Sequence, residues 1–129
     1  MADFRKLHVW RKAHAMALNA HRVCGKIRKR EHNSLKTQLM RAAMSVPANI
    51  VEGRGHKTDR EFARFLRIAL ASATELEYHL IVGNDIGAIE QQDFQSLLDE
   101  VVDTKKMLTG LLNRLDPEKP PSAPKQTAL

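Results

Sequence analysis

The sequence predicts an all-α protein, an antiparallel up-down-up-down four-helix bundle. Three observations predict this class. Apolar residues recur at spacings of three and four along most of the chain, which is the period of a helix with one buried face. Aromatic residues make up only 5% of the chain, and runs of the strand-favouring residues Val, Ile, Thr and Tyr are absent. A chain of 129 residues also suits one domain whose core needs no disulfide or metal.

The first helix is expected over residues 7–30. Its apolar residues fall on one face: Val9, Ala13, Met16, Ala20, Val23 and Ile27. Four basic residues would then occupy its last turn, where positive charge favours the negative end of the helix dipole. They are Lys26, Arg28, Lys29 and Arg30.

The second helix is expected over residues 34–53. Asn33 or Ser34 can cap its first turn, and Gly53 and Gly55 can end it. Pro47 lies inside the apolar pattern, so we expect a kink at that point. The core residues of this helix share the same spacing: Leu35, Leu39, Ala42, Val46 and Ile50.

The third helix is expected over residues 59–86, because Thr58 and Glu61 form a capping box. The fourth is expected over residues 90–115, and it opens with acidic residues. Loops this short place successive helices as antiparallel neighbours, so residues 1–115 form the predicted bundle. The proline-rich residues 116–129 are expected to be a disordered tail.

Cys24 is the only cysteine, which excludes an intramolecular disulfide. The first residues lack the apolar segment of a secretory signal, and no apolar run approaches the roughly 20 residues that cross a bilayer. We therefore expect a cytoplasmic protein that has no membrane association.

The second helix carries a further apolar stripe, roughly opposite its core residues. The third helix carries a weaker stripe of the same kind. Scattered exposed apolar residues are normal on any surface, but four in line over three turns favour contact with a neighbouring subunit. The candidate oligomer-interface residues are Met40, Met44, Ala48, Val51, Ala71, Tyr78 and Val82.

A line of polar residues runs along one side of the second helix, between its two apolar faces. Such residues either form a solvated edge or hydrogen-bond across a helix–helix boundary and fix its register. The residues of this polar line are Gln38, Arg41, Ser45, Asn49 and Glu52.

Charge is distributed unevenly along the chain. Residues 1–67 carry 16 Lys and Arg against 5 Asp and Glu, whereas residues 68–129 carry 5 against 10. The basic half predicts a surface that neutralises nucleic-acid phosphates, with little sequence specificity. The alternatives are a solubilising face and a face that pairs with the acidic fourth helix of another subunit. The candidate nucleic-acid-binding residues are Arg11, Arg22, Lys26, Arg28, Lys29, Arg60, Arg64 and Arg67.

The sequence contains no arrangement that predicts catalysis, a metal site or a cofactor. Its six histidines form neither an HExxH motif nor a pattern with paired cysteines. The segment Gly53-Arg-Gly55 lacks the longer glycine pattern of phosphate-binding loops. We therefore expect a binding protein and not an enzyme.

Three segments of the chain are distinctive: Leu7-His-Val-Trp-Arg-Lys-Ala13, Gln38-Leu-Met-Arg-Ala-Ala-Met-Ser-Val-Pro-Ala-Asn-Ile-Val-Glu-Gly53, and Glu61-Phe-Ala-Arg-Phe-Leu-Arg-Ile-Ala69 followed by Glu75-Leu-Glu77. They resemble the 23S ribosomal RNA intervening-sequence protein family, and the likeness extends over about residues 5–115. The resemblance implies a four-helix bundle that assembles into a ring-like homopentamer. It also implies distant kinship with accessory proteins of diversity-generating retroelements, which bind nucleic acid and a reverse transcriptase.

These patterns together predict a homo-oligomer that binds RNA or DNA through its basic surface. The alternative is a protein–protein adaptor whose basic face docks an acidic protein partner.

Overall fold

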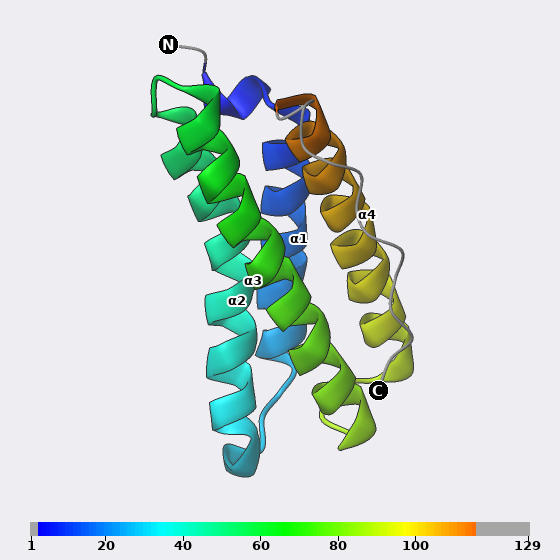
Figure 1. The fold of residues 1–129 in the computed structure, drawn as a ribbon. Coiled ribbons are helices and arrows are strands. Elements are labelled where there is room, and N and C mark those ends of the chain that lie inside the picture. Colours follow the sequence, from blue (N-terminus) through cyan, green and yellow to red (C-terminus); the bar gives the residue numbers. More distant parts are fainter. Residues whose placement is uncertain (1–2, 116–129) are drawn as a thin grey trace, which may run out of the picture.

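The computed structural model describes residues 3–115, and all regular structure in that range is helical. The four α-helices, shown in Figure 1, are α1 (His8–Gly25), α2 (Asn33–Arg54), α3 (Asp59–Asp85) and α4 (Gln91–Leu115). Single 3₁₀ turns precede two of them, at Phe4–Lys6 and Arg30–His32. The all-α class and the number of helices are as the sequence predicts. The expected tail over residues 116–129 lies outside the described residues.

Each helix packs against two others. Helix α1 contacts α2 and α4, and α3 contacts the same two helices (Figure 1). Two ion pairs show the register between α1 and α4: Lys12 pairs with Asp103, and Arg22, farther along α1, pairs with Asp93. Along this boundary, the residue numbers of α1 increase in the direction in which those of α4 decrease.

The core holds the apolar residues that the helical spacing predicts. A fully buried Leu, Ile or Met side chain contributes about 1.5–3 kcal/mol, and the core holds eight such residues. They are Met16, Leu39, Ile50, Leu66, Leu76, Leu80, Leu97 and Leu108. Cys24 is also buried, and the loss of solvation raises the pKa of its thiol to about 11. None of the described helices is long and apolar enough to cross a membrane.

The predicted end of the first helix is wrong. Helix α1 stops at Gly25, so Lys26, Arg28 and Lys29 lie in the connection to α2 and not in a last helical turn. Glycine is a poor helix residue, less favourable than alanine by about 1 kcal/mol. Ile27 is buried after the break, at 3% exposed, as the helical spacing predicts. The backbone N–H groups of Lys26 and Ile27 donate to the carbonyl groups of Val23 and Cys24, three residues back, in place of the bonds of a continued α-helix.

Of the two glycines predicted to end the second helix, Gly55 is its C-cap, as predicted, whereas the role predicted for Gly53 is wrong. Helix α2 continues through the buried Pro47 to Arg54, and Gly53 lies inside its last turn. A Cβ atom on Gly53 would stand 2.7 Å from Cβ of Phe65 and 3.3 Å from the carbonyl oxygen of Phe62. The glycine is therefore required by the close approach of α2 to the start of α3.

Candidate nucleic-acid interface

Apart from Arg11, which lies in the first turn of α1, the candidate basic residues fall into two groups at opposite ends of the bundle. One group lies in the first half of α3, near the α2–α3 turn, and comprises Arg60, Arg64 and Arg67. The other lies at the α1–α2 connection, at the lower end in Figure 1. The 22 residues of α2 run between the two ends. A helix of that length spans about 33 Å, so the two groups of basic residues lie far apart on the bundle.

Several of the predicted basic residues are already paired with carboxylates of the same chain. Arg22 and Lys26 both contact Asp93, at 3.2 and 3.0 Å. Lys12 lies 3.7 Å from Asp103, and the Asn19 side chain donates to Glu100. We call these contacts between α1 and α4 the α1–α4 seam. Part of the basic first half of the chain thus pairs with the acidic fourth helix of the same chain. The alternative considered above placed this pairing between two subunits.

Asp93 is the centre of the α1–α4 seam. Its side chain is 11% exposed, and it accepts hydrogen bonds from Lys26 Nζ and Arg22 Nη2. The hydrogen bond from Lys26 lowers the pKa of Asp93, with a further contribution from Arg22 and against the effect of burial. Asp93 is therefore ionised at neutral pH and holds two cations that would otherwise face solvent.

Three cations beside this seam remain unpaired. Arg28, Lys29 and Arg30 are exposed, and no carboxylate of residues 3–115 lies within 4.0 Å of their charged groups. We call these three residues the loop cluster. Arg64, in contrast, bonds to Glu61 at 2.9 Å and covers the ring of Phe65. The sequence reasoning placed Arg28 and Lys29 among the candidates and omitted Arg30, although the uninterrupted cationic run already signalled it.

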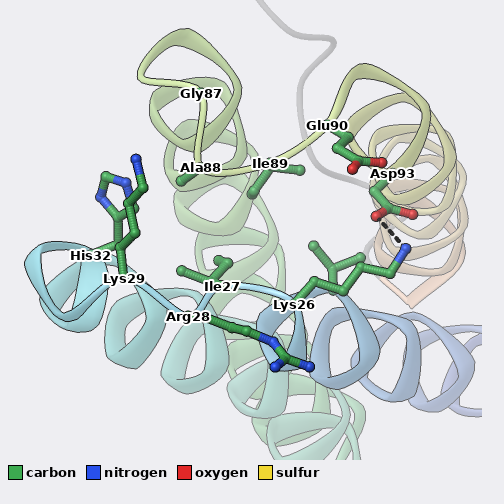
Figure 2. Close-up of a pocket in the computed structure, with 11 residues that line it drawn as sticks. Lys26, Ile27, Arg28, Lys29, His32, Gly87, Ala88, Ile89, Glu90 and Asp93 are labelled. Carbon is green, nitrogen blue, oxygen red and sulfur yellow. Dashed lines mark hydrogen bonds and ion pairs between the residues drawn. The ribbon is translucent and has the colours of Figure 1, made fainter.

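A cleft of about 330 Å³ lies next to the loop cluster, between the α1–α2 connection and the α3–α4 turn (Figure 2). We call it the end cleft. Its apolar part includes Ile27 and Ile89, each 3% exposed. Figure 2 shows Lys29 and His32 together on one side and Glu90 near Asp93 on the other. Sequence reasoning missed His32 and Glu90, because only the fold brings these two loops together.

The polar line of α2 faces α3. The hydroxyl groups of Ser45 and Ser72 share a hydrogen bond of 2.8 Å, and the Asn49 amide donates to the Ser45 hydroxyl at 3.0 Å. Arg41 bonds to both Gln38 and Glu75, while Glu52 is exposed. His79 also hydrogen-bonds to Glu75 at 3.1 Å, and this bond is the main reason that the pKa of Glu75 is lowered. These contacts fix the register between α2 and α3.

Replacement of Ser72 by Ala tests this register. We expect a loss of about 1 kcal/mol in the free energy of unfolding, because the half-buried Ser45 hydroxyl loses a partner. Denaturant unfolding measures the change. Ser96→Ala is the control, since Ser96 is exposed on α4. The double variant Ser45→Ala/Ser72→Ala should recover part of the loss, and equal effects of Ser72→Ala and Ser96→Ala would contradict the assignment.

The candidate interface residues differ in exposure. Met44 is 58% and Tyr78 61% exposed, and Ala48 and Ala71 are also exposed. The others are half-buried: Met40, Val51 and Val82. Met40 packs against the core cluster, so this member of the stripe contributes to the bundle itself. The exposed apolar surface of α2 and α3 therefore differs from the predicted stripe, because Met40, Val51 and Val82 are half-buried and Ile68 and Ile81 of α3 are exposed.

No group of three or more His, Cys, Asp or Glu residues in the described range is placed to hold a metal ion. His14, for example, stacks on Trp10 with ring centroids 4.8 Å apart.

Four helices around one apolar core, with polar contacts along their boundaries and cations without a carboxylate partner at both ends of the described bundle, define a helical-bundle protein with a basic surface. The family model described as 23S rRNA-intervening sequence protein matches residues 5–110. The chain belongs to this family.

A solved structure shares the fold. It is a protein of unknown function from the S23 ribosomal protein family of Bacteroides thetaiotaomicron VPI-5482. The match has a TM-score of 0.76 at 23% identity, and it covers 81% of this chain and 97% of that one. No curated protein matches the chain.

Proposed function

We propose that the protein is a non-catalytic homo-oligomer that binds RNA or DNA through its basic surface, with little sequence specificity. The observation that carries this proposal is the loop cluster. Arg28, Lys29 and Arg30 are adjacent, exposed and without a carboxylate partner among residues 3–115. Unpaired cations release counterions from a phosphate backbone on binding, and this release is the main source of non-specific affinity.

The assembly part of the proposal is supported by the exposed side chains of α2 and α3. Met44 and Tyr78 are more than half exposed, and Ile68 is 40% exposed. Contact with further copies would remove this apolar area from water. We propose the antiparallel bundle as the subunit and a ring-like homopentamer as the assembly, as the family resemblance implies.

Binding of labelled RNA and DNA at several salt concentrations tests the proposal. We expect affinity to fall as salt rises, and similar affinities for unrelated sequences. The variant Arg28→Glu/Lys29→Glu/Arg30→Glu should weaken the salt dependence of binding. If each cation contacts one phosphate, the magnitude of the negative slope of log affinity against log salt should decrease by about two to three. Fluorescence anisotropy measures both quantities.

A variant with the same change in net charge is the matched control. Arg60→Glu/Arg64→Glu/Arg67→Glu reverses three charges at the other end of the bundle. The loop-cluster variant should lose more affinity, because Arg64 is already paired with Glu61. Equal losses would mean that only net charge matters, and an absence of binding by the unaltered protein at low salt would refute the proposal. Light scattering after size exclusion, with and without nuclease, reports the number of subunits.

An adaptor that docks an acidic protein partner is the second candidate. The exposed Met44 and Tyr78 favour it, because phosphate backbones offer no partner for such side chains. The adaptor would be supported if reversing the charges of the loop cluster abolished binding of a protein partner and left the affinity for nucleic acid unchanged.

A further inference from the structure

We propose that the end cleft binds a single unstacked nucleotide, with its phosphate at Lys29 and His32 and its base edge at Glu90. This inference rests on the proposed nucleic-acid binding and assigns it a site that recognises one nucleotide. It arises from three features of the cleft: its size, its apolar surface and the separation of its charges.

The size suits a small ligand. A volume of about 330 Å³ lies at the lower end of the range for small-molecule sites, roughly 300–1,000 Å³. A folded domain or a duplex cannot enter such a space. One nucleotide at a chain end or in a single-stranded loop can enter it, since such bases are free to leave their stack.

The apolar surface suits a base. Ile27 and Ile89, each 3% exposed, form the buried floor of the cleft, and the half-buried Ala88 lies between the charged groups at the two sides (Figure 2). The face of a nucleobase packs favourably against the aliphatic carbon that Ala88 leaves open, because both surfaces leave water. Among the described residues, the lining of the cleft holds no Phe, Tyr or Trp side chain, and its one aromatic ring, His32, lies on the phosphate side, so aliphatic packing would hold the base.

The two sides of the cleft carry opposite charge. On one side Lys29 has no carboxylate partner among residues 3–115, and His32 stands beside it (Figure 2). On the other side Asp93 is committed to Lys26 and Arg22, which leaves Glu90 as the available acceptor. A phosphate matches the first side, and a base edge that donates hydrogen bonds matches the second.

The charge pattern also predicts which base is preferred. A carboxylate accepts two parallel hydrogen bonds from the N1–H and N2–H groups of guanine. Uracil presents a single N–H between two carbonyl oxygens, which a carboxylate repels. One good bidentate pair gives about 1–3 kcal/mol of discrimination. Because Glu90 is exposed, we expect the lower part of that range, so guanosine monophosphate should bind about five- to tenfold more tightly than uridine monophosphate.

NMR titration of the full chain with mononucleotides tests the site. Guanosine monophosphate should shift the resonances of Ile27, Ile89 and Glu90. Guanosine and inorganic phosphate, used separately, should each bind more weakly than the nucleotide. Absence of binding, or shifts that lie elsewhere on the protein, would overturn the proposal.

Two variants separate the roles of the two sides. Glu90→Gln should bring the ratio of guanosine to uridine monophosphate affinity close to one, whereas Lys29→Gln should weaken both nucleotides equally. Asp85→Asn and Lys57→Gln are matched controls, because both residues are exposed and neither lines the cleft. An unchanged ratio in Glu90→Gln would overturn the assigned orientation.

The outcomes distinguish this inference from the proposed function. Salt-dependent binding of long RNA without any binding of mononucleotides would leave the proposed function intact and refute the cleft. Tight binding of an amino acid or peptide in place of nucleotides would also refute it, since such zwitterions match the same charge separation. Binding of mononucleotides without binding of long nucleic acid would instead support the cleft and refute the proposed function.

Discussion

Replacement of Gly53 by Ala should lower the free energy of unfolding by about 1–3 kcal/mol, the usual effect of an overpacked site. The added methyl group would meet Cβ of Phe65 at 2.7 Å and the carbonyl oxygen of Phe62 at 3.3 Å. Both atoms belong to the framework of α3, so neither can rotate away as the end of a long side chain can. Helix α3 must move as a unit, which disturbs the packing of Phe62 and Ala63 as well. Denaturant unfolding at fixed protein concentration measures the loss.

Gly110→Ala is the matched control for this prediction. Gly110 also lies inside a helix, but the nearest atom to an added Cβ is Arg114 Nη1, at 3.8 Å. Without a clash, the higher helix propensity of alanine should stabilise the protein by up to about 1 kcal/mol. The same sign of change in both variants would contradict the contact role of Gly53. Gly83 is an intermediate case, because its nearest neighbour is the flexible end of Ile89, at 2.5 Å.

Replacement of Asp93 by Asn should lower the free energy of unfolding by about 1–2 kcal/mol at pH 7. The change keeps the size of the side chain and removes the charge that Lys26 and Arg22 contact. Hydrogen bonds to charged groups contribute about 1.5–3 kcal/mol, and solvent screening reduces this value because both cations are about half exposed.

The effect of Asp93→Asn should depend on pH. The folded-state pKa of Asp93 lies below its ordinary value, so its contribution is present above the unfolded pKa of about 3.9. The contribution is lost as pH falls through the folded pKa. The difference between the two proteins should therefore be constant from about pH 5 to 8 and shrink below about pH 4.

Asp99→Asn is the control for the seam. Asp99 is exposed and bonds only to Gln95 among the described residues, at 2.9 Å. We expect a change within about 0.5 kcal/mol. A difference between Asp93→Asn and the unaltered protein that persists undiminished at pH 3 would show that the charge of Asp93 is not responsible.

The sequence by itself determined the helices and the residues that fill the core. Helical period is a local property: the spacing of Val9, Ala13 and Met16 fixes a buried face whatever the neighbouring helix is. The start of α3 was equally local, because the Thr58 hydroxyl accepts from the N–H of Glu61, three residues away. The family motif that ends at Gly53 was also recognisable in the sequence. The reason for the glycine, the close approach of α3 to α2, was visible only in the structure.

Tertiary structure alone decided which charges are free. The sequence shows Arg22, Lys26, Arg28 and Lys29 as one basic run, but Asp93 takes the first two. That pairing joins residues about 70 positions apart, since 71 and 67 residues separate the partners. The end cleft has the same origin, because Lys29 and Glu90 line one cleft only when the α1–α2 connection lies beside the α3–α4 turn. Electrostatic pairing acts through space over a few ångströms, so a residue's neighbours in the chain do not reveal its partner.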